Sequence, residues 1–178
     1  MIMIILFLLF NNVNSNNFIN YINSIDIINI KGEINNDLYN KLINYKLTND
    51  KYINIYIKSH GGNLLDAINI IYLIKEFEKN KTVICIAEIA YSVAFTIFQS
   101  CKNRYILSDS VLMQHEFIII NNNYDINIIN NIIYYIRYLE ANKLKIKLSL
   151  YLEKVKNELW LFGQDILDNN AADKLIDL

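Results

Sequence analysis

The sequence predicts an α/β domain built around a mostly parallel β-sheet. Short runs rich in β-branched residues, such as 52–58 (YINIYIK) and 82–86 (TVICI), are typical of buried strands. Between them lie longer segments with apolar residues at helical spacing, such as 64–77. Strands that alternate with helices favour βαβ units, and right-handed crossovers coil successive units into a superhelix. The length of 178 residues fits one ordinary domain.

The expected elements follow this alternation along the chain. The first half contains a strand over 24–31, a helix over 36–45, a strand over 52–58, a helix over 64–77 and a strand over 82–86. The second half contains a short helix over 92–100, two strands over 104–107 and 111–114 around a turn, a long helical region over 125–155, and a helix and final strand over 165–178.

The composition excludes some functions and gives weight to each glycine. A formal net charge of −1 provides no electrostatic footprint for nucleic acid, so we expect no nucleic-acid partner. The chain has only 4 Gly and no Pro, so each Gly that is present is informative. Cys85 and Cys101 do not form a metal or redox spacing, and we expect two buried thiols, no disulfide, no metal and no cofactor.

The N-terminal segment allows two interpretations. Residues 1–10 (MIMIILFLLF) are continuously apolar and precede an Asn-rich stretch. They are too few to span a bilayer, which takes about 20 apolar residues. A signal-peptide core and a buried or interfacial strand both stay open, although a positive n-region and a small-residue cleavage site are missing. We expect an N-terminal segment over 1–23, a single folded domain over 24–178, and a cytoplasmic or organellar location unless the segment acts as a signal.

Three polar or glycine-containing sequences follow three of the predicted strands. Gly61 and Gly62 lie between a predicted strand and the helix that follows it. Ser92 is the first residue of the short helix predicted after 82–86, and His115 directly follows the strand predicted over 111–114. Each has a structural interpretation of its own: a tight turn, a helix N-cap and a strand-end histidine. Because the carboxyl ends of parallel strands meet at one edge of a sheet, the three together predict a nucleophile, a general base and an oxyanion hole.

At these sequences the chain resembles the Clp protease proteolytic subunit. SHGG stands where that family has SPGG, AYSVAF where it has an ASMGAF-type serine motif, and RYILSDSVLMQHE where it has R(F/Y)-x-x-P-x-S-x-x-M-x-H. IKGEIN upstream and WLFGQDILDNNAAD downstream resemble the family's LxGxV and FLSAxEAxxxGLVD segments. The resemblance covers about residues 25–173. It implies a ClpP/crotonase-like superhelix of βαβ units with a protruding helical handle.

The resemblance also implies site residues. Ser92 matches the nucleophile when the chains are aligned on SVAF, whereas an ungapped alignment on TVICI puts Tyr91 there and implies an inactive subunit. His115 is the implied general base, and Glu158 falls on the family's third triad position. Gly61 and Val93 are the implied main-chain donors of the oxyanion hole.

The implied function is that of a serine endopeptidase, the proteolytic subunit of an ATP-dependent Clp-like protease that degrades unfolded polypeptides. The implied assembly is a self-associated ring, expected as stacked heptamers, fed by a separate AAA+ unfoldase, since the chain has no phosphate-binding loop. The alternative is a catalytically inactive structural subunit of a mixed Clp-type ring.

Overall fold

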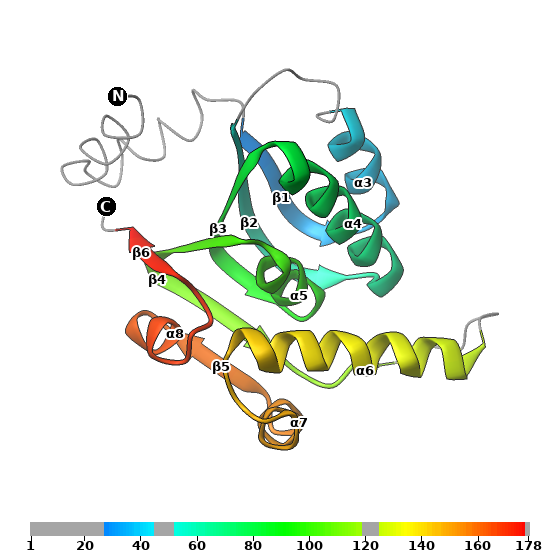
Figure 1. Ribbon diagram of the computed structural model, residues 1–178, viewed down its shortest axis with the longest axis vertical. Helices are drawn as coiled ribbons and strands as arrows, with labels where there is room; N and C mark the ends of the chain where they lie inside the picture. Colours follow the sequence, from blue (N-terminus) through cyan, green and yellow to red (C-terminus); the bar gives the residue numbers. More distant parts are fainter. Residues whose placement is uncertain (1–26, 45–51, 119–124, 177–178) are drawn as a thin grey trace.

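A computed structural model of the chain describes residues 27–44, 52–118 and 125–176. The elements in chain order are β1 (Ile27–Ile34), α3 (Asn36–Ile43), β2 (Tyr52–Gly62), α4 (Leu64–Asn80), β3 (Thr82–Tyr91), α5 (Val93–Ser100), β4 (Asn103–Gln114), α6 (Ile126–Lys143), α7 (Leu148–Lys156), β5 (Leu159–Phe162), α8 (Gln164–Asp168) and β6 (Lys174–Ile176) (Figure 1). Residues 1–26, which include the apolar segment, lie outside the described residues.

The strands form one six-stranded sheet in the order β1-β2-β3-β4-β5, with β6 paired to β4. The pairs β1–β2, β2–β3, β3–β4 and β4–β6 are parallel, and among the described strands only β5 runs antiparallel to its neighbour. The prediction of an α/β domain with a mostly parallel sheet is therefore confirmed.

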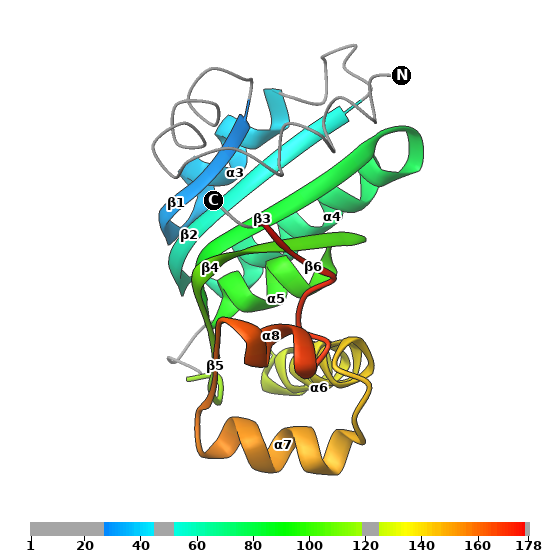
Figure 2. The ribbon, with the colours of Figure 1, turned by 90° about the vertical axis from the view of Figure 1, so that its left-hand side faces the viewer.

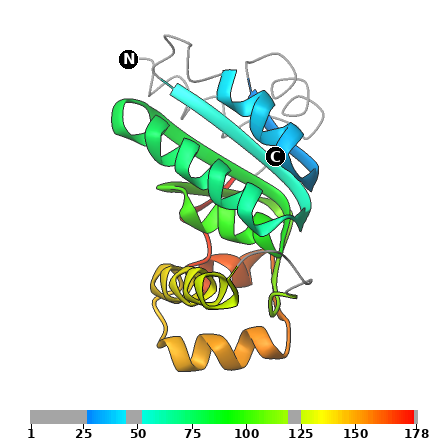
Figure 3. The same ribbon diagram turned by 90° about the vertical axis from the view of Figure 1, so that its right-hand side faces the viewer.

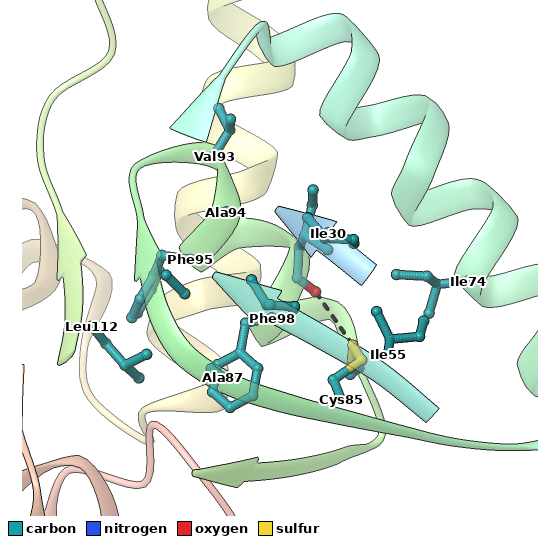
Figure 4. Close-up of a cluster of buried hydrophobic side chains, with 14 of the residues drawn as sticks. Ile30, Ile55, Ile74, Cys85, Ala87, Val93, Ala94, Phe95, Phe98 and Leu112 are labelled. Carbon is teal, nitrogen blue, oxygen red and sulfur yellow. Dashed lines mark hydrogen bonds between the residues drawn. A yellow bond between two sulfur atoms is a disulfide. The ribbon is translucent and has the colours of Figure 1, made fainter. Parts of the chain in front are cut away.

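The helices α3 and α4 cover one face of this sheet, and α5 packs on the same side against β2 and β3 (Figures 2 and 3). The main hydrophobic core lies between these two layers. Figure 4 shows strand residues such as Ile30 and Ile55 against Ile74 of α4 and Phe95 and Phe98 of α5, and all five are buried. A second, smaller cluster of buried side chains comes from five strands and consists of Ile27, Tyr56, Ile86, Leu107 and Ile176.

Helix α6 extends well beyond the sheet, so the expected helical handle is present (Figure 1). The region 125–155 is two helices rather than one. It breaks after Leu144, where Lys145 takes a left-handed φ of 57°, and α7 then packs against α6. None of the helices in the described ranges is both long and apolar enough to cross a lipid bilayer.

The strand boundaries differ from the prediction in two places. The segments 104–107 and 111–114 belong to one strand, β4, because the Ser110 hydroxyl accepts the Leu107 N–H and donates to the Ala87 carbonyl, which holds the expected turn inside the sheet. Strand β5 was not predicted. With four residues it is shorter than the usual strand of about 5–6 residues, and its strand geometry depends on pairing with β4.

The expectation of two unpaired thiols was wrong. Cys85 of β3 and Cys101 at the end of α5 form a disulfide, with their Cα atoms 6.2 Å apart. Both residues are buried in the main core, one in the sheet and one in the helix layer, so a spacing of 16 residues along the chain gave no sign of this closeness. The bond ties the end of α5 to the strand that precedes this helix.

Candidate functional site

The candidate site lies at the carboxyl edge of the three central parallel strands. β2 ends at Gly62, β3 ends at Tyr91 and β4 ends at Gln114, and these strands are neighbours in the sheet. Gly61, Ser92 and His115 therefore come to one edge, as the sequence predicted. This is the edge at which α/β sheets place their ligands.

Ser92 occupies a strained turn between β3 and α5. Its φ of 54° and ψ of −126° lie outside the regions that non-glycine residues ordinarily populate, and its side chain makes no capping hydrogen bond to the helix. The chain makes a similar turn between β5 and α8, where φ is 46° and ψ is −119°, but there it uses Gly163. Tyr91, the other candidate for the nucleophile position, is the last residue of β3 and has no such conformation.

Gly61 lies directly against Ser92. Its φ is +103°, and a β-carbon built on it would come within 2.9 Å of Ser92 Cβ, 3.0 Å of the Tyr91 carbonyl oxygen and 3.4 Å of Ser92 Oγ. These separations are below ordinary van der Waals contact for the first two atoms, so only glycine fits this position without displacement. The close packing of the serine turn thus explains why a glycine occupies position 61.

His115 follows β4 at the same edge. The Ser92 N–H donates to the Met113 carbonyl at 2.9 Å, which fixes the serine turn to the strand end two residues before His115. The His115 side chain is half-buried. Within the described part of the chain, no hydrogen bond joins the His115 ring to Ser92 Oγ.

Glu158 directly precedes β5, and His115 directly follows β4. The last residue of β4, Gln114, is opposite the first residue of β5, Leu159. Glu158 has a φ of 58° and an exposed side chain, and its Oε2 accepts a hydrogen bond from Trp160 Nε1 at 3.0 Å. The carboxylate is thus engaged by the indole.

The two predicted oxyanion-hole donors differ in their availability. Val93 is the first residue of α5, and the N–H groups of a first helical turn have no partner within the helix, so this end attracts an anion. The Gly61 N–H instead donates to Ser59 Oγ at 3.1 Å, and the Ser59 hydroxyl donates in turn to the Gly32 carbonyl at 2.6 Å. Ser59 is a buried site residue that the sequence did not reveal.

A row of aromatic rings crosses the strands beside the serine turn. The Tyr91 ring lies 5.1 Å from the His60 ring and 5.3 Å from the Trp160 ring between centroids, and Trp160 stacks on Phe162. Tyr91 thus has a packing role at the end of β3. His60, which replaces the proline of the SPGG motif, takes part in the same row.

The sequence also missed a buried polar network behind the site. It consists of a carboxylate and its partners from four elements: Glu140, Arg137, Thr96, Gln114 and Tyr151. Burial, reinforced by the Glu140 carboxylate, raises the pKa of the Tyr151 hydroxyl far above its usual range, so this group stays a donor at all ordinary pH values. A charged pair three residues apart on a helix gives no sign in the sequence that both side chains are buried.

Comparison with known proteins identifies the family of this chain. None of the curated proteins matches the chain. The family model of Clp protease matches residues 11–117, well over half of the chain, and this range contains the SHGG segment, the serine turn and His115. Together with the parallel sheet and the protruding handle, this match shows that the chain belongs to the Clp protease family.

Proposed function

We propose that this chain is a serine endopeptidase, the proteolytic subunit of an ATP-dependent Clp-like protease that degrades unfolded polypeptides. The observation that carries the proposal is the strained main chain of Ser92 against Gly61. Strain of this kind persists only where the surroundings impose it, and it concentrates at functional sites. A sharp strand-to-helix turn that presents a serine is the geometry of an activated nucleophile.

The residues at the sheet edge supply the parts of a peptide hydrolysis. His115 takes the Ser92 Oγ proton while Oγ bonds to the scissile carbonyl carbon, and the carbonyl electron pair moves to oxygen. The Val93 N–H donates to this oxyanion, and the Gly61 N–H joins it when it turns from Ser59 Oγ. The C–N bond then breaks, the leaving amine takes the proton from His115, and water releases the acyl group by the same route.

A fluorophosphonate probe tests the assignment of the nucleophile. We expect mass spectrometry of the labelled, assembled protein to place the adduct on Ser92. Ser92→Ala should lose both the adduct and peptide cleavage. Tyr91→Phe is the matched control, because it removes the only other candidate oxygen while keeping the ring that packs on Trp160. An adduct that survives in Ser92→Ala would refute the assignment.

The assembly that we propose is a self-associated ring, stacked as two heptamers and served by a separate AAA+ unfoldase. The support in this chain is the handle helix, which exposes large apolar side chains over much of its length: Ile126, Ile128, Tyr134, Tyr135, Tyr138 and Leu139. Contiguous exposed apolar surface on a soluble protein marks an interaction site. Light scattering at micromolar concentration should give a multiple of the subunit mass, whereas a monomer would contradict the proposal.

A second candidate is a catalytically inactive structural subunit of a mixed ring. The observation that favours it is the state of the two proposed partners of Ser92: His115 has no hydrogen bond to Ser92 Oγ within the described ranges, and Trp160 engages the carboxylate of Glu158. Endopeptidase activity requires Glu158 to release the indole and orient His115. Glu158→Gln should then lower turnover by about four orders of magnitude, and an unlabelled Ser92 in the assembled parent protein would favour the structural subunit.

A further inference from the structure

The carboxylate of Glu140 is the centre of a buried network between the handle and the sheet edge. Its side chain is 2% exposed, yet it accepts four hydrogen bonds. Thr96 Oγ1 donates to Oε1 at 2.7 Å and Gln114 Nε2 donates to the same atom at 2.8 Å. Arg137 Nη1 donates to Oε2 at 2.9 Å and Tyr151 Oη at 2.8 Å. A buried charge with this many donors is fully compensated, so the network holds its partners in one arrangement.

One arm of the network holds the main chain of His115 on both sides. The His115 N–H donates to Gln114 Oε1 at 3.1 Å, and the His115 carbonyl accepts from Arg137 Nη2. The Arg137 guanidinium also lies over the Phe117 ring, 4.2 Å from its centroid. Arg137 of α6 therefore contacts both His115 and Phe117. Both polar groups of the His115 main chain are therefore bonded to side chains that also bond Glu140.

The other arm reaches the helix that begins at the serine turn. Thr96 lies in the first turn of α5, and its N–H donates to the Ser92 carbonyl at 3.3 Å. Its hydroxyl donates to the Glu140 atom that also receives Gln114, and Gln114 Nε2 lies 3.2 Å from that hydroxyl. One carboxylate oxygen thus joins the first turn after Ser92 to the strand end before His115.

We infer that Glu140 and Arg137 are positioning residues that set the separation of Ser92 and His115. The inference rests on the proposed function. A nucleophile and its base must approach to about 2.6–3.2 Å for proton transfer, and a misplacement of about 1 Å costs about 10²-fold in rate. The His115 ring has no hydrogen bond to Ser92 Oγ within the described residues. The main chain that these side chains hold carries the ring, so its position limits how closely the ring can approach Ser92.

The test compares two buried arginines that differ in their link to His115. Arg137→Lys keeps a positive charge beside Glu140, but a lysine ammonium lacks the planar fork that bonds Glu140 and the His115 carbonyl together. Arg104→Lys is the matched control, because the Arg104 side chain is similarly buried, 6% against 4% exposed, and pairs with Asp173 away from His115.

In Arg137→Lys we expect kcat for a small peptide to fall about 10- to 100-fold with KM within about threefold, as expected for a displaced base rather than lost substrate binding. Hydrogen exchange of the 114–117 segment should become faster in this variant. Arg104→Lys should change neither kcat nor the exchange of that segment. A kcat in Arg137→Lys equal to that of the parent, or an equal fall in both variants, would overturn the inference.

A milder pair of variants decides the case if Arg137→Lys does not fold. Thr96→Val removes the hydroxyl that bonds Glu140 at nearly constant volume, while Thr96→Ser retains it. We expect kcat to fall about tenfold in Thr96→Val and to stay within about threefold of the parent in Thr96→Ser. Equal kcat values in the two variants would overturn the inference. A parent protein that neither cleaves peptide nor labels at Ser92 would overturn the proposed function itself, and the inference with it.

Discussion

Replacing Gly61 by alanine tests the contact between the SHGG segment and the serine turn. An alanine at a φ of +103° carries backbone strain of about 1–2 kcal/mol. Its β-carbon would also lie 2.9 Å from Ser92 Cβ and 3.0 Å from the Tyr91 carbonyl oxygen, which is overpacking of a kind that costs about 1–3 kcal/mol. The expected loss in the free energy of unfolding is therefore about 2–5 kcal/mol.

Gly32→Ala is the control for the strain alone. Gly32 has a φ of +77°, and a β-carbon built on it meets nothing within 4 Å. It should therefore lose only the strain of about 1–2 kcal/mol. The difference between the two variants isolates the collision with the serine turn.

Two measurements on the assembled protein check the expectation. Denaturant unfolding should rank the parent above Gly32→Ala and Gly32→Ala above Gly61→Ala. The rate of fluorophosphonate labelling should fall about 10²-fold in Gly61→Ala, because the alanine pushes Ser92 from its place, and should stay near the parent rate in Gly32→Ala. If Gly61→Ala matches Gly32→Ala in both stability and labelling rate, Gly61 does not contact Ser92 and the site geometry is wrong.

Three further expectations follow from the same structure. Ser92→Gly relieves a backbone strain that Ser92→Ala keeps, so its free energy of unfolding in denaturant should be about 1 kcal/mol higher than that of Ser92→Ala, while both variants lack activity. Equal stabilities would count against a strained serine. Burial alone raises the pKa of Asp173, but hydrogen bonds from Arg104 outweigh it and hold the pKa below its usual value. Stability from this group is therefore present above about pH 4 and lost below it, and the parent's advantage over Asp173→Asn should shrink as the pH falls through that range. Cys85→Ala should lower the free energy of unfolding by about 3 kcal/mol, since it opens the loop between two residues 16 apart in the sequence. Reductant should destabilise the parent but not this variant.

The fold and the place of the site could be predicted because they depend on local pattern and on one general property of parallel sheets. Apolar runs of period 2 and 3.6 predicted the alternation of strands and helices, and the carboxyl ends of neighbouring parallel strands must share an edge. The sequence therefore predicts Gly61, Ser92 and His115 at the same edge. The boundaries were less predictable: β5 has a weak local signal, and pairing with β4 makes it a strand.

Only the tertiary structure shows the contacts between separate elements of the chain. Cys85 and Cys101 were expected as separate thiols, because their spacing says nothing about how α5 folds back on β3. The choice between Tyr91 and Ser92 for the turn likewise depends on where β3 ends, and one residue of register moves a side chain to the other face of a strand.

The sequence by itself predicted an α/β chain of the Clp protease type, with Gly61, Ser92 and His115 at one sheet edge. The tertiary structure alone decided which groups satisfy the buried charge of Glu140 and hold the Gly61 N–H. The physical reason is that a buried polar group takes whatever partner the packed elements bring within hydrogen-bonding distance. Periodicity in the sequence records the face of an element, but it does not record that distance.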